Sequence, residues 1–320
     1  MLIGIEDVLA AKAALKGIAL RTPLLPYPSG TQGGNGLWLK PECFQPTGSF
    51  KVRGANNAVR SLAAQGSLPG VVTHSSGNHG QALAHAAQSL GIPCVVVMPD
   101  NARELKVAAT RLWGARIEMV PAVQREPRAR ALAEELGYTL IPPYDLPAII
   151  AGQGTVGVEI VEDLPDVETV LVPVGGGGLS SGVATAVKAL APRARVVGVE
   201  PELAADAAEG LRGGARVVWP AERTGRTDAD GLRTNLSDLT FEHLNARLDG
   251  IVTVTERQIS DAVAELARTA HVVAEPSGAV APAAALFCAD ELPGGRTVAV
   301  VSGGNIDPAY LCASLTQDAA

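Results

Sequence analysis

Short apolar runs rich in β-branched residues recur along the chain, separated by longer Ala-rich runs. Each short run predicts a strand that is buried on both faces, because no polar position interrupts it. We expect such strands at residues 71–74, 94–98, 169–174, 194–200 and 297–302.

The longer runs predict helices between these strands. We expect helices at residues 78–90, 124–136, 179–190, 256–270 and 277–290. Thr255 followed by Gln258 is typical of a capping box at the start of one of them. Regular alternation of strand and helix predicts an α/β fold, in which helices cover both faces of parallel sheets.

Two stretches interrupt the pattern. Pro142, Pro143 and Pro147 predict a break near the middle of the chain, and the Gly-, Arg- and Thr-rich residues 210–230 predict one long loop. Loops of that length in compact domains are often functional.

Composition limits the class of protein. A chain of 320 residues predicts about two domains. Its net charge of −7 and its 3% aromatic content argue against nucleic-acid partners. No apolar run reaches the roughly 18–20 residues that a membrane helix needs. The N-terminus has no basic start before its apolar residues, so we expect a cytoplasmic protein without a membrane partner.

The four cysteines match no zinc or redox spacing, so free thiols are expected at Cys43, Cys94, Cys288 and Cys312.

Three glycine-rich turns follow predicted strands, at residues 75–80, 175–178 and 302–305. Ligands of open α/β sheets bind at the carboxyl ends of the strands, so these turns predict one shared crevice. Gly175–Gly178 would present backbone N–H groups at a helix N-terminus, which suits a phosphate. The run fits neither the G-x-G-x-x-G nor the Walker A pattern, although Glu200 lies where a ribose-binding acid would be.

Lys51 is one of only six lysines and lies between Phe50 and Val52 after a Pro-Thr-Gly-Ser turn. A desolvated ammonium has a lowered pKa, and a neutral lysine amine forms Schiff bases with carbonyl compounds. The small polar residues 74–80 predict a carboxylate site at a helix N-terminus.

Taken together, residues 40–54, 75–80, 151–155, 175–179, 200–201 and 302–305 resemble one family. The chain is similar, from about residue 5 to 312, to the pyridoxal-phosphate-dependent serine/threonine dehydratases and serine racemases, of the tryptophan-synthase-β-like fold type II. The resemblance implies two three-layer αβα domains with mostly parallel sheets and pyridoxal 5′-phosphate in the cleft between them. Residues 1–69 and 148–320 would form a large cofactor-binding domain, and 70–147 a small substrate-side domain. A homodimer is also implied.

The resemblance assigns cofactor roles to individual residues. Lys51 would bind the cofactor covalently, Phe50 would pack near its ring and Asn78 would bond the ring's 3′-oxygen. Ser302 would face the pyridine nitrogen. The phosphate would be held by Gly175, Gly176, Gly177, Gly178 and the Leu179 amide.

Substrate and metal roles follow from the same resemblance. The substrate carboxylate would be received by Ser75, Ser76, Asn78 and His79, and Thr234 with Asn235 would line the pocket. Lys51 and Ser76 would act as catalytic residues on opposite faces of the substrate carbon. The metal would be Mg²⁺ or Ca²⁺, held by Glu200, Ala204 and Asp206; this interpretation of Glu200 displaces ribose binding.

The implied activity is an ammonia-lyase reaction on L-threonine, L-serine or a related β-hydroxy amino acid, giving a 2-oxo acid. Tyr144 departs from the racemase pattern and favours a dehydratase, while Ser76 keeps serine racemisation open. Arg125 and Arg128 keep 3-hydroxyaspartate open as a substrate. Val52 argues against β-replacement. The alternatives of another class are a non-catalytic ligand-binding module and, with less support, a nicotinamide oxidoreductase.

Overall fold

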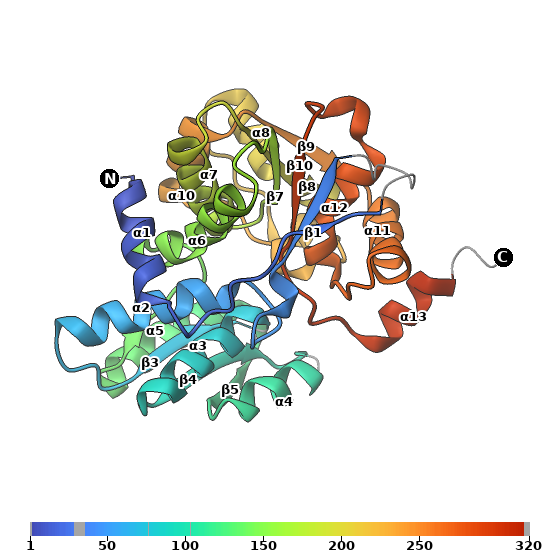
Figure 1. Ribbon diagram of the computed structural model, residues 1–320. Helices are drawn as coiled ribbons and strands as arrows, with labels where there is room; N and C mark the ends of the chain where they lie inside the picture. Colours follow the sequence, from blue (N-terminus) through green and yellow to red (C-terminus); the bar gives the residue numbers. More distant parts are fainter. Residues whose placement is uncertain (1, 29–35, 76, 103, 317–320) are drawn as a thin grey trace.

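The computed structural model describes residues 2–28, 36–75, 77–102 and 104–316. Figure 1 shows two α/β parts, one above the other, each built around its own sheet. We call the part around the six-stranded sheet the larger unit and the part around the four-stranded sheet the smaller unit. The predicted α/β fold with parallel sheets in two domains is confirmed.

The larger sheet has the strand order β1-β2-β10-β7-β8-β9, and only β1 pairs antiparallel to its neighbour. Its strands are β1 (Leu25–Pro26), β2 (Leu37–Pro41), β7 (Thr169–Pro173), β8 (Arg195–Pro201), β9 (Gly250–Val254) and β10 (Thr297–Val301). Since β2, β10, β7, β8 and β9 run parallel, their carboxyl ends lie at one edge.

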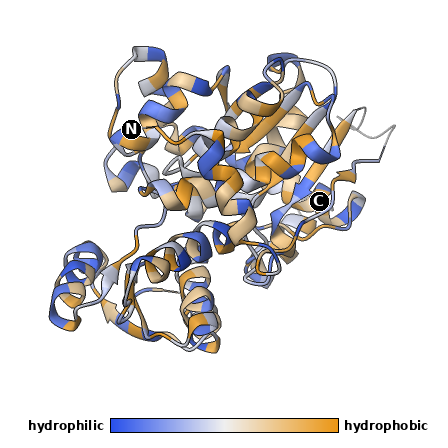
Figure 2. Cartoon of the chain, turned by 60° about the vertical axis from the view of Figure 1, so that its left-hand side comes forward, coloured by the Kyte–Doolittle hydropathy of each residue, from blue (hydrophilic) through white to orange (hydrophobic). Residues whose placement is uncertain are grey.

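Helices cover both faces of this sheet. Alternate strand residues point to opposite faces, so Leu171 packs with α11 and α12, whereas Val170 and Val172 pack with α6 and α7. Figure 2 shows these strands mostly in the colour of apolar residues. The helices of the larger unit are α1 (Ile5–Ala14), α6 (Pro147–Asp163), α7 (Gly178–Leu190), α8 (Asp206–Gly213), α9 (Ala221–Thr224), α10 (Asp238–Arg247), α11 (Glu256–Thr269), α12 (Pro276–Phe287) and α13 (Pro308–Thr316).

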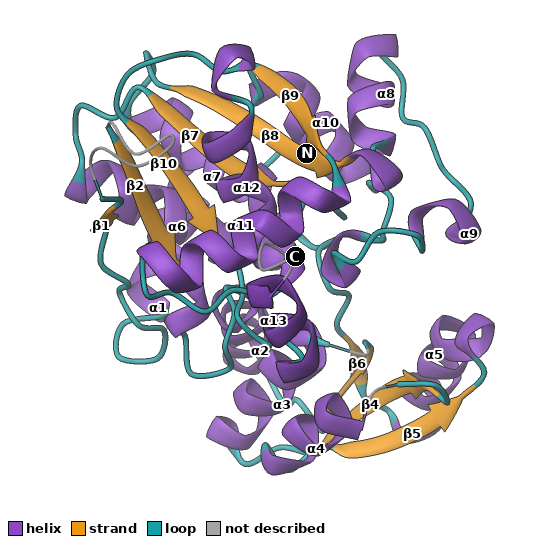
Figure 3. Cartoon of the chain, turned by 90° about the vertical axis from the view of Figure 1, so that its right-hand side faces the viewer, coloured by secondary structure: helices purple, strands orange, loops and turns teal. Residues whose placement is uncertain are grey.

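The smaller sheet has the order β5-β4-β3-β6 and is parallel throughout. Its strands are β3 (Val71–His74), β4 (Cys94–Pro99), β5 (Arg116–Val120) and β6 (Thr139–Leu140). The helices α3 (Asn78–Leu90), α4 (Glu104–Leu112) and α5 (Arg125–Leu136) complete the unit. Figure 3 shows it below the larger unit, with α2 (Lys51–Gln65) near the junction.

The predicted elements are present, with boundaries within a residue or two for most of them. The helix expected at 277–290 ends at Phe287. The Thr255–Gln258 capping box is confirmed, with the Gln258 N–H donating to Thr255 Oγ1. The single long loop expected at 210–230 is wrong, because the end of α8 and all of α9 lie within it.

The sequence pattern gave no prediction for several helices, namely α1, α2, α4, α6, α10 and α13. The glycines of α6 explain why that helix was missed. A Cβ at Gly152 would lie 2.6 Å from Gly54 Cα, and one at Gly154 would lie 2.9 Å from the Gly182 carbonyl oxygen. These glycines let α6 contact α2 and α7 at backbone distance. In the sequence they resemble helix breakers.

Within the described residues, no helix combines the length and the apolar character needed to cross a bilayer. The four cysteines are free thiols, as expected.

Charged side chains are buried where α2 begins. The Arg53 guanidinium donates to Glu42, at 2.7 and 2.8 Å, and to Glu159, at 2.7 and 2.9 Å. Lys40 Nζ lies 2.7 Å from Glu159 as well, and Thr22 Oγ1 donates to Glu42. Two cations and two carboxylates therefore balance in the core, and they fix α2 to β2 and α6.

We expect Arg53→Met to lower the free energy of unfolding by about 3–5 kcal/mol, because Glu42 and Glu159 would stay buried without their main cation. Urea unfolding measures this. Arg130→Met is the matched control, since Arg130 forms an exposed i,i+4 pair with Glu126 and should cost about 0.5 kcal/mol or less. A similar small cost for both variants would contradict the role of the cluster.

Candidate active site

The turn before Lys51 is attached to the carboxyl edge of the larger sheet. The Phe50 N–H donates to the Ser302 carbonyl at 3.1 Å, and the Gly304 N–H donates to the Gly48 carbonyl at 2.9 Å. Gly48 has φ +70°, a left-handed conformation that favours glycine. Two segments far apart in the sequence therefore meet just beyond β10.

Lys51 is the first residue of α2 and is partly buried. Its Nζ donates to the Pro143 carbonyl at 2.8 Å and lies 5.1 Å from the centre of the Phe50 ring. No ion pair of Lys51 is found in the described part of the chain. Burial lowers the pKa of Lys51 to about 8, so this amine exchanges its proton near neutral pH.

The tetraglycine segment connects β7 to α7 and is buried. Gly177 has φ +83° and precedes the first residue of α7. A Cβ at Gly176 would lie 2.3 Å from the Tyr144 ring, and one at Gly175 would lie 2.8 Å from Leu232 Cα. Side chains are thus excluded, and the backbone N–H groups at the start of α7 remain available to an anion.

Residues 143 and 144 join these two features. The Pro143 carbonyl accepts the Lys51 hydrogen bond, while the next residue, Tyr144, packs against Gly176 and Gly178. Tyr144 Oη donates to the Asn235 carbonyl at 3.1 Å, and burial raises the pKa of Tyr144 to about 12. The nucleophilic amine and the anion cradle therefore belong to one site.

Asn78 is the first residue of α3 in the smaller unit, and its side chain contacts the larger unit. Its Nδ2 donates to Glu275 at 2.5 Å, and its Oδ1 accepts from Asn305 Nδ2 at 2.7 Å. Because an ionised carboxylate only accepts, the charged form of Glu275 fixes the orientation of the Asn78 amide. Burial, followed by the charge of Asp230, raises the pKa of Glu275 to about 7.

Sequence reasoning missed Glu275 and gave no role to the side chain of Asn305. The only signal for Glu275 was its place directly before Pro276 at the start of a predicted helix. Nothing along the chain indicated contact with Asn78, which is 197 positions away.

His79 is buried and neutral. Burial, assisted by the charge of Lys51, lowers the pKa of His79 to about 3. Nε2 lies 3.1 Å from the Ile141 carbonyl and therefore carries the hydrogen, which leaves Nδ1 as an acceptor with no partner in the described structure. A carboxylate at this helix can thus be bound by the backbone N–H of His79 but not by its ring.

The remaining residues proposed for the cofactor and substrate lie in different surroundings. Ser302 is buried, and its Oγ donates to the Ser277 carbonyl at 3.2 Å. Ser75 Oγ accepts from the Gly77 N–H, whereas Ser76 lies outside the described residues. Thr234 is exposed, and it is the neighbouring Asn235 that contacts Tyr144.

Glu200 and Asp206 are both buried at the end of β8. Glu200 accepts from the Ala207 and Ala208 N–H groups at 3.1 and 2.8 Å, and Asp206 accepts from the Leu236 N–H at 3.3 Å. Burial and the charge of Asp206 raise the pKa of Glu200 well above its usual range, and burial raises that of Asp206 to about 6. Among the described residues, neither forms a salt bridge, and no group of three or more metal-ligating side chains occurs.

The two arginines considered for the second carboxylate of a substrate have different hydrogen-bond partners. Arg128 is paired with Glu118 and with Glu135 on the surface of the smaller unit. Arg125 Nε donates to the Ala122 carbonyl. Arg125 is the first residue of α5, and after burial its charge is among the causes that lower the pKa of His74, the last residue of β3.

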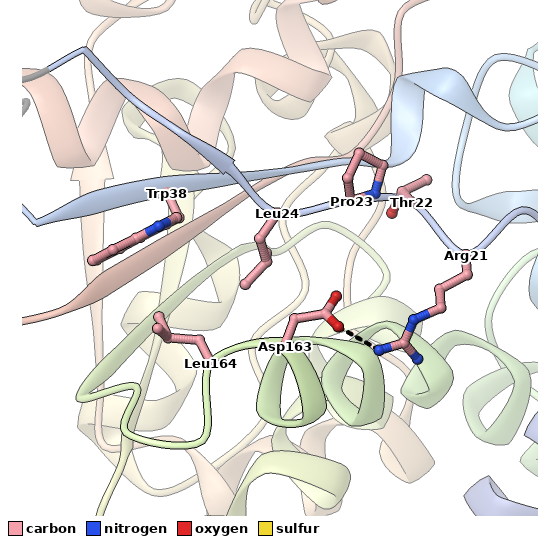
Figure 4. Close-up of a pocket in the computed structure, with 7 residues that line it drawn as sticks. All are labelled: Arg21, Thr22, Pro23, Leu24, Trp38, Asp163 and Leu164. Carbon is pink, nitrogen blue, oxygen red and sulfur yellow. Dashed lines mark hydrogen bonds and ion pairs between the residues drawn. The ribbon is translucent and has the colours of Figure 1, made fainter.

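An open pocket of about 410 Å³ lies elsewhere, lined by Arg21, Thr22, Pro23, Leu24, Trp38, Asp163 and Leu164. Figure 4 shows the ion pair of Arg21 with Asp163 at one end and Trp38 at the other. Trp38 and Leu164 lie near the amino ends of β2 and β7, whereas residues 21–24 precede the antiparallel β1 beside the carboxyl end of β2, so the pocket runs along the outer edge of the sheet. Its lining includes neither Lys51 nor the tetraglycine segment.

Comparison with known proteins agrees with this geometry. The family model described as "Pyridoxal-phosphate dependent enzyme" matches residues 15–303. The chain is 44% identical to the L-threonine ammonia-lyase of Thermotoga maritima, over 96% of this chain and 76% of that protein. It is 40% identical to the L-threo-3-hydroxyaspartate ammonia-lyase of Saccharomyces cerevisiae, over 94% and 93%.

Among solved structures, the maize serine racemase superimposes with a TM-score of 0.92 at 36% identity. The superposition covers 100% of this chain and 98% of that one. The similarity therefore extends over both units.

Because its pKa is about 8, we expect the Lys51 amine of the cofactor-free protein to react with an amine-specific reagent at a rate that rises with pH and is half-maximal near pH 8. An ordinary lysine would reach half its maximum near pH 10.4. Peptide mass mapping of the modified site measures the rate, with the exposed Lys16 as the internal control. A half-maximum near pH 10 for Lys51 would contradict the desolvation of this amine.

Proposed function

Because this chain belongs to the family of pyridoxal-phosphate-dependent enzymes, we propose that it is an ammonia-lyase for a β-hydroxy amino acid such as L-threonine or L-serine. The β-hydroxyl leaves as water, and a water molecule then releases ammonia, so the product is a 2-oxo acid. One observation carries the proposal: the Lys51 amine, with its pKa lowered to about 8, lies beside the residues that pack on the glycine cradle.

The residues present fit pyridoxal 5′-phosphate. The amides of Gly175–Gly178 and Leu179, at the positive end of α7, suit its phosphate, and a Cβ at any of these glycines would collide with a neighbour. Phe50 and Ser302 are joined beside Lys51 by the hydrogen bond from the Phe50 N–H to the Ser302 carbonyl, and with Asn78 they would contact the cofactor ring. The bound cofactor supplies an electron sink that makes the α-proton of a substrate amino acid acidic.

Lys51 is the group that moves this proton. A pKa of about 8 means that Nζ can take up a proton and release it again at neutral pH at little cost. Its contact with Pro143 orients Nζ toward the cradle side of the cleft. Ser76 is our candidate for a second proton-transfer residue on the opposite face.

The first turn of α3 binds the substrate carboxylate. Its backbone N–H groups, at Asn78 and His79, have no partner within the helix, and the helix dipole favours a negative charge there. Ser75 adds a hydroxyl at the same turn. The partly buried Tyr144 covers Gly176 and Gly178 and so shields the cradle side from water.

Substrates with a second carboxylate form the second candidate class. The place of Arg125 favours it, because α5 begins at Arg125 after β5 and packs against β3, so this cation lies at the carboxyl edge of the smaller sheet, as the start of α3 does. Two of the relatives are named for hydroxyaspartate. Several others are serine racemases, so racemisation is the side activity to measure.

We also propose a divalent cation, Mg²⁺ or Ca²⁺, at Glu200 and Asp206 with the Ala204 carbonyl. The support is physical: two buried carboxylates lie close enough to raise the pKa of Glu200, without a salt-bridge partner in the described structure. Oxygen ligands of this kind suit both ions.

We infer that residues 70–147 form the small domain, since all four strands of the smaller sheet fall within them. We further infer a cytoplasmic homodimer. Leu20, Phe44 and Val273 are nearly half exposed, and all three border the segment around Cys43 and Gln45. A second copy would cover this apolar surface, and light scattering would then give twice 32.8 kDa.

We expect Lys51→Ala to reduce ammonia release from L-threonine by about a hundredfold to ten-thousandfold, because the proton-transfer group is lost. A coupled assay for the 2-oxo acid and ammonia measures this. Lys188→Ala, which removes a lysine of a surface ion pair on α7, is the control. Unchanged ammonia release from Lys51→Ala would rule out the proposed chemistry.

The same assay, run with L-serine and L-threo-3-hydroxyaspartate, separates the substrate classes. If 3-hydroxyaspartate is the preferred substrate, Arg125→Met should raise its KM without changing that of L-threonine. Chiral analysis of L-serine measures racemisation.

We expect millimolar Mg²⁺ to raise the melting temperature of the wild type by about 1.5 °C for each kcal/mol of binding free energy, given the unfolding entropy of a chain of this length. Glu200→Gln should abolish this rise, whereas Glu202→Gln, an exposed acid of the same segment, should keep it. Equal melting temperatures with Mg²⁺ and with a chelator would refute the cation site.

A further inference from the structure

An ion pair between described residues joins the two units beside the candidate active site. Lys106, on α4 of the smaller unit, pairs with Asp230, the first residue of the 3₁₀ turn η4 (Asp230–Leu232) in the larger unit. The Lys106 side chain is 18% exposed and that of Asp230 is 39% exposed, so the pair is accessible to salt but partly shielded.

Both partners border the site. Lys106 Nζ lies 3.9 Å from the position that a Cβ of Gly77 would occupy, just before the first turn of α3. On the other side, the Gly231 N–H donates to Ser277 Oγ at 2.8 Å, and Leu232 contacts Gly175. The pair thus spans from the carboxylate turn to the cradle.

Acidic side chains of the larger unit surround the Lys106 ammonium. A small cavity of about 120 Å³ is lined by both partners together with Asp228, Glu275 and Asp307 from the larger unit. The other cation of its lining, Arg233, donates to the Thr227 carbonyl. The smaller unit therefore offers a positive charge to an acidic rim.

The units are also joined by the hydrogen bonds of Asn78 with Glu275 and Asn305 beside the site and, on another side, by the packing around α2. There α2 packs against both α3 and α6, with Gly54 and Gly152 in backbone contact. That side can serve as a hinge, because the buried ion pairs of Arg53 and the close backbone contact of Gly54 with Gly152 hold it together. Among the described residues, the ion pair that joins α4 to the larger unit is that of Lys106 with Asp230.

We propose that the Lys106–Asp230 ion pair is a clasp that keeps the two units closed over the bound substrate. Both residues are positioning residues, since neither belongs to the groups assigned to the reacting atoms. The proposal rests on the proposed function in one respect, namely that the amino acid binds in this cleft. Loss of the clasp would speed substrate release while leaving the chemistry intact.

The test compares Lys106→Met, Asp230→Asn, the double variant and the charge swap Lys106→Asp/Asp230→Lys in the holoenzyme. We expect each single variant to raise KM about two- to fivefold with kcat unchanged, the size of a partly exposed ion pair. The KM of the double variant should be no higher than that of either single variant, and the charge swap should restore the wild-type KM. Lys12→Met, which breaks the ion pair of Lys12 with Glu162 within the larger unit, is the matched control and should leave KM unchanged.

Hydrogen exchange without substrate tests the clasp independently of activity. The amides of 104–112 and 228–235 should exchange faster in both single variants and in wild-type protein at high salt, but not in Lys12→Met. If no amino acid is turned over, the proposed function fails while this measurement still decides the clasp. Unchanged exchange, or a KM raised by Lys106→Met but not by Asp230→Asn, would overturn the proposal.

Discussion

Removal of one amine from water is the constraint on which the site depends. Burial lowers the pKa of Lys51 to about 8, and the surrounding structure holds that amine in place. The preceding turn is bonded to the end of β10. Arg53, two residues after Lys51, anchors the first turn of α2 through four hydrogen bonds to two buried carboxylates. A partly desolvated lysine is therefore held on a rigid helix rather than on a mobile loop.

Glycine residues form the anion cradle, which is the second component of the site besides Lys51. The same residue type has two physical uses here: it frees backbone N–H groups at the start of α7, and it brings α6 within backbone contact of α2 and α7. The first use exposes donors to an anion, and the second fixes the cradle relative to Lys51. Tyr144 connects the two, because its ring packs on Gly176 while its neighbour Pro143 accepts from Lys51.

Local patterns in the sequence predicted much of this. The apolar runs predicted strands that are buried on both faces, and the glycine run after β7 predicted an anion site, because both properties are local. The Lys51 environment could also be anticipated from Phe50 and Val52. Glu275 and its bond to Asn78 could not, since only the fold brings two residues 197 positions apart into contact. Helix α6 was missed because its glycines serve packing rather than chain breaking, and the short helix α9 was missed inside a segment that has the composition of a loop.

The proposed activity requires that Lys51 is the residue to which the cofactor is attached. The most direct measurement is borohydride reduction of the purified holoenzyme, followed by peptide mass mapping. We predict that a pyridoxyl-phosphate mass is added to the peptide containing Lys51 and that the visible absorbance disappears. Addition at another lysine, or no addition to a protein that binds the cofactor, would contradict the account.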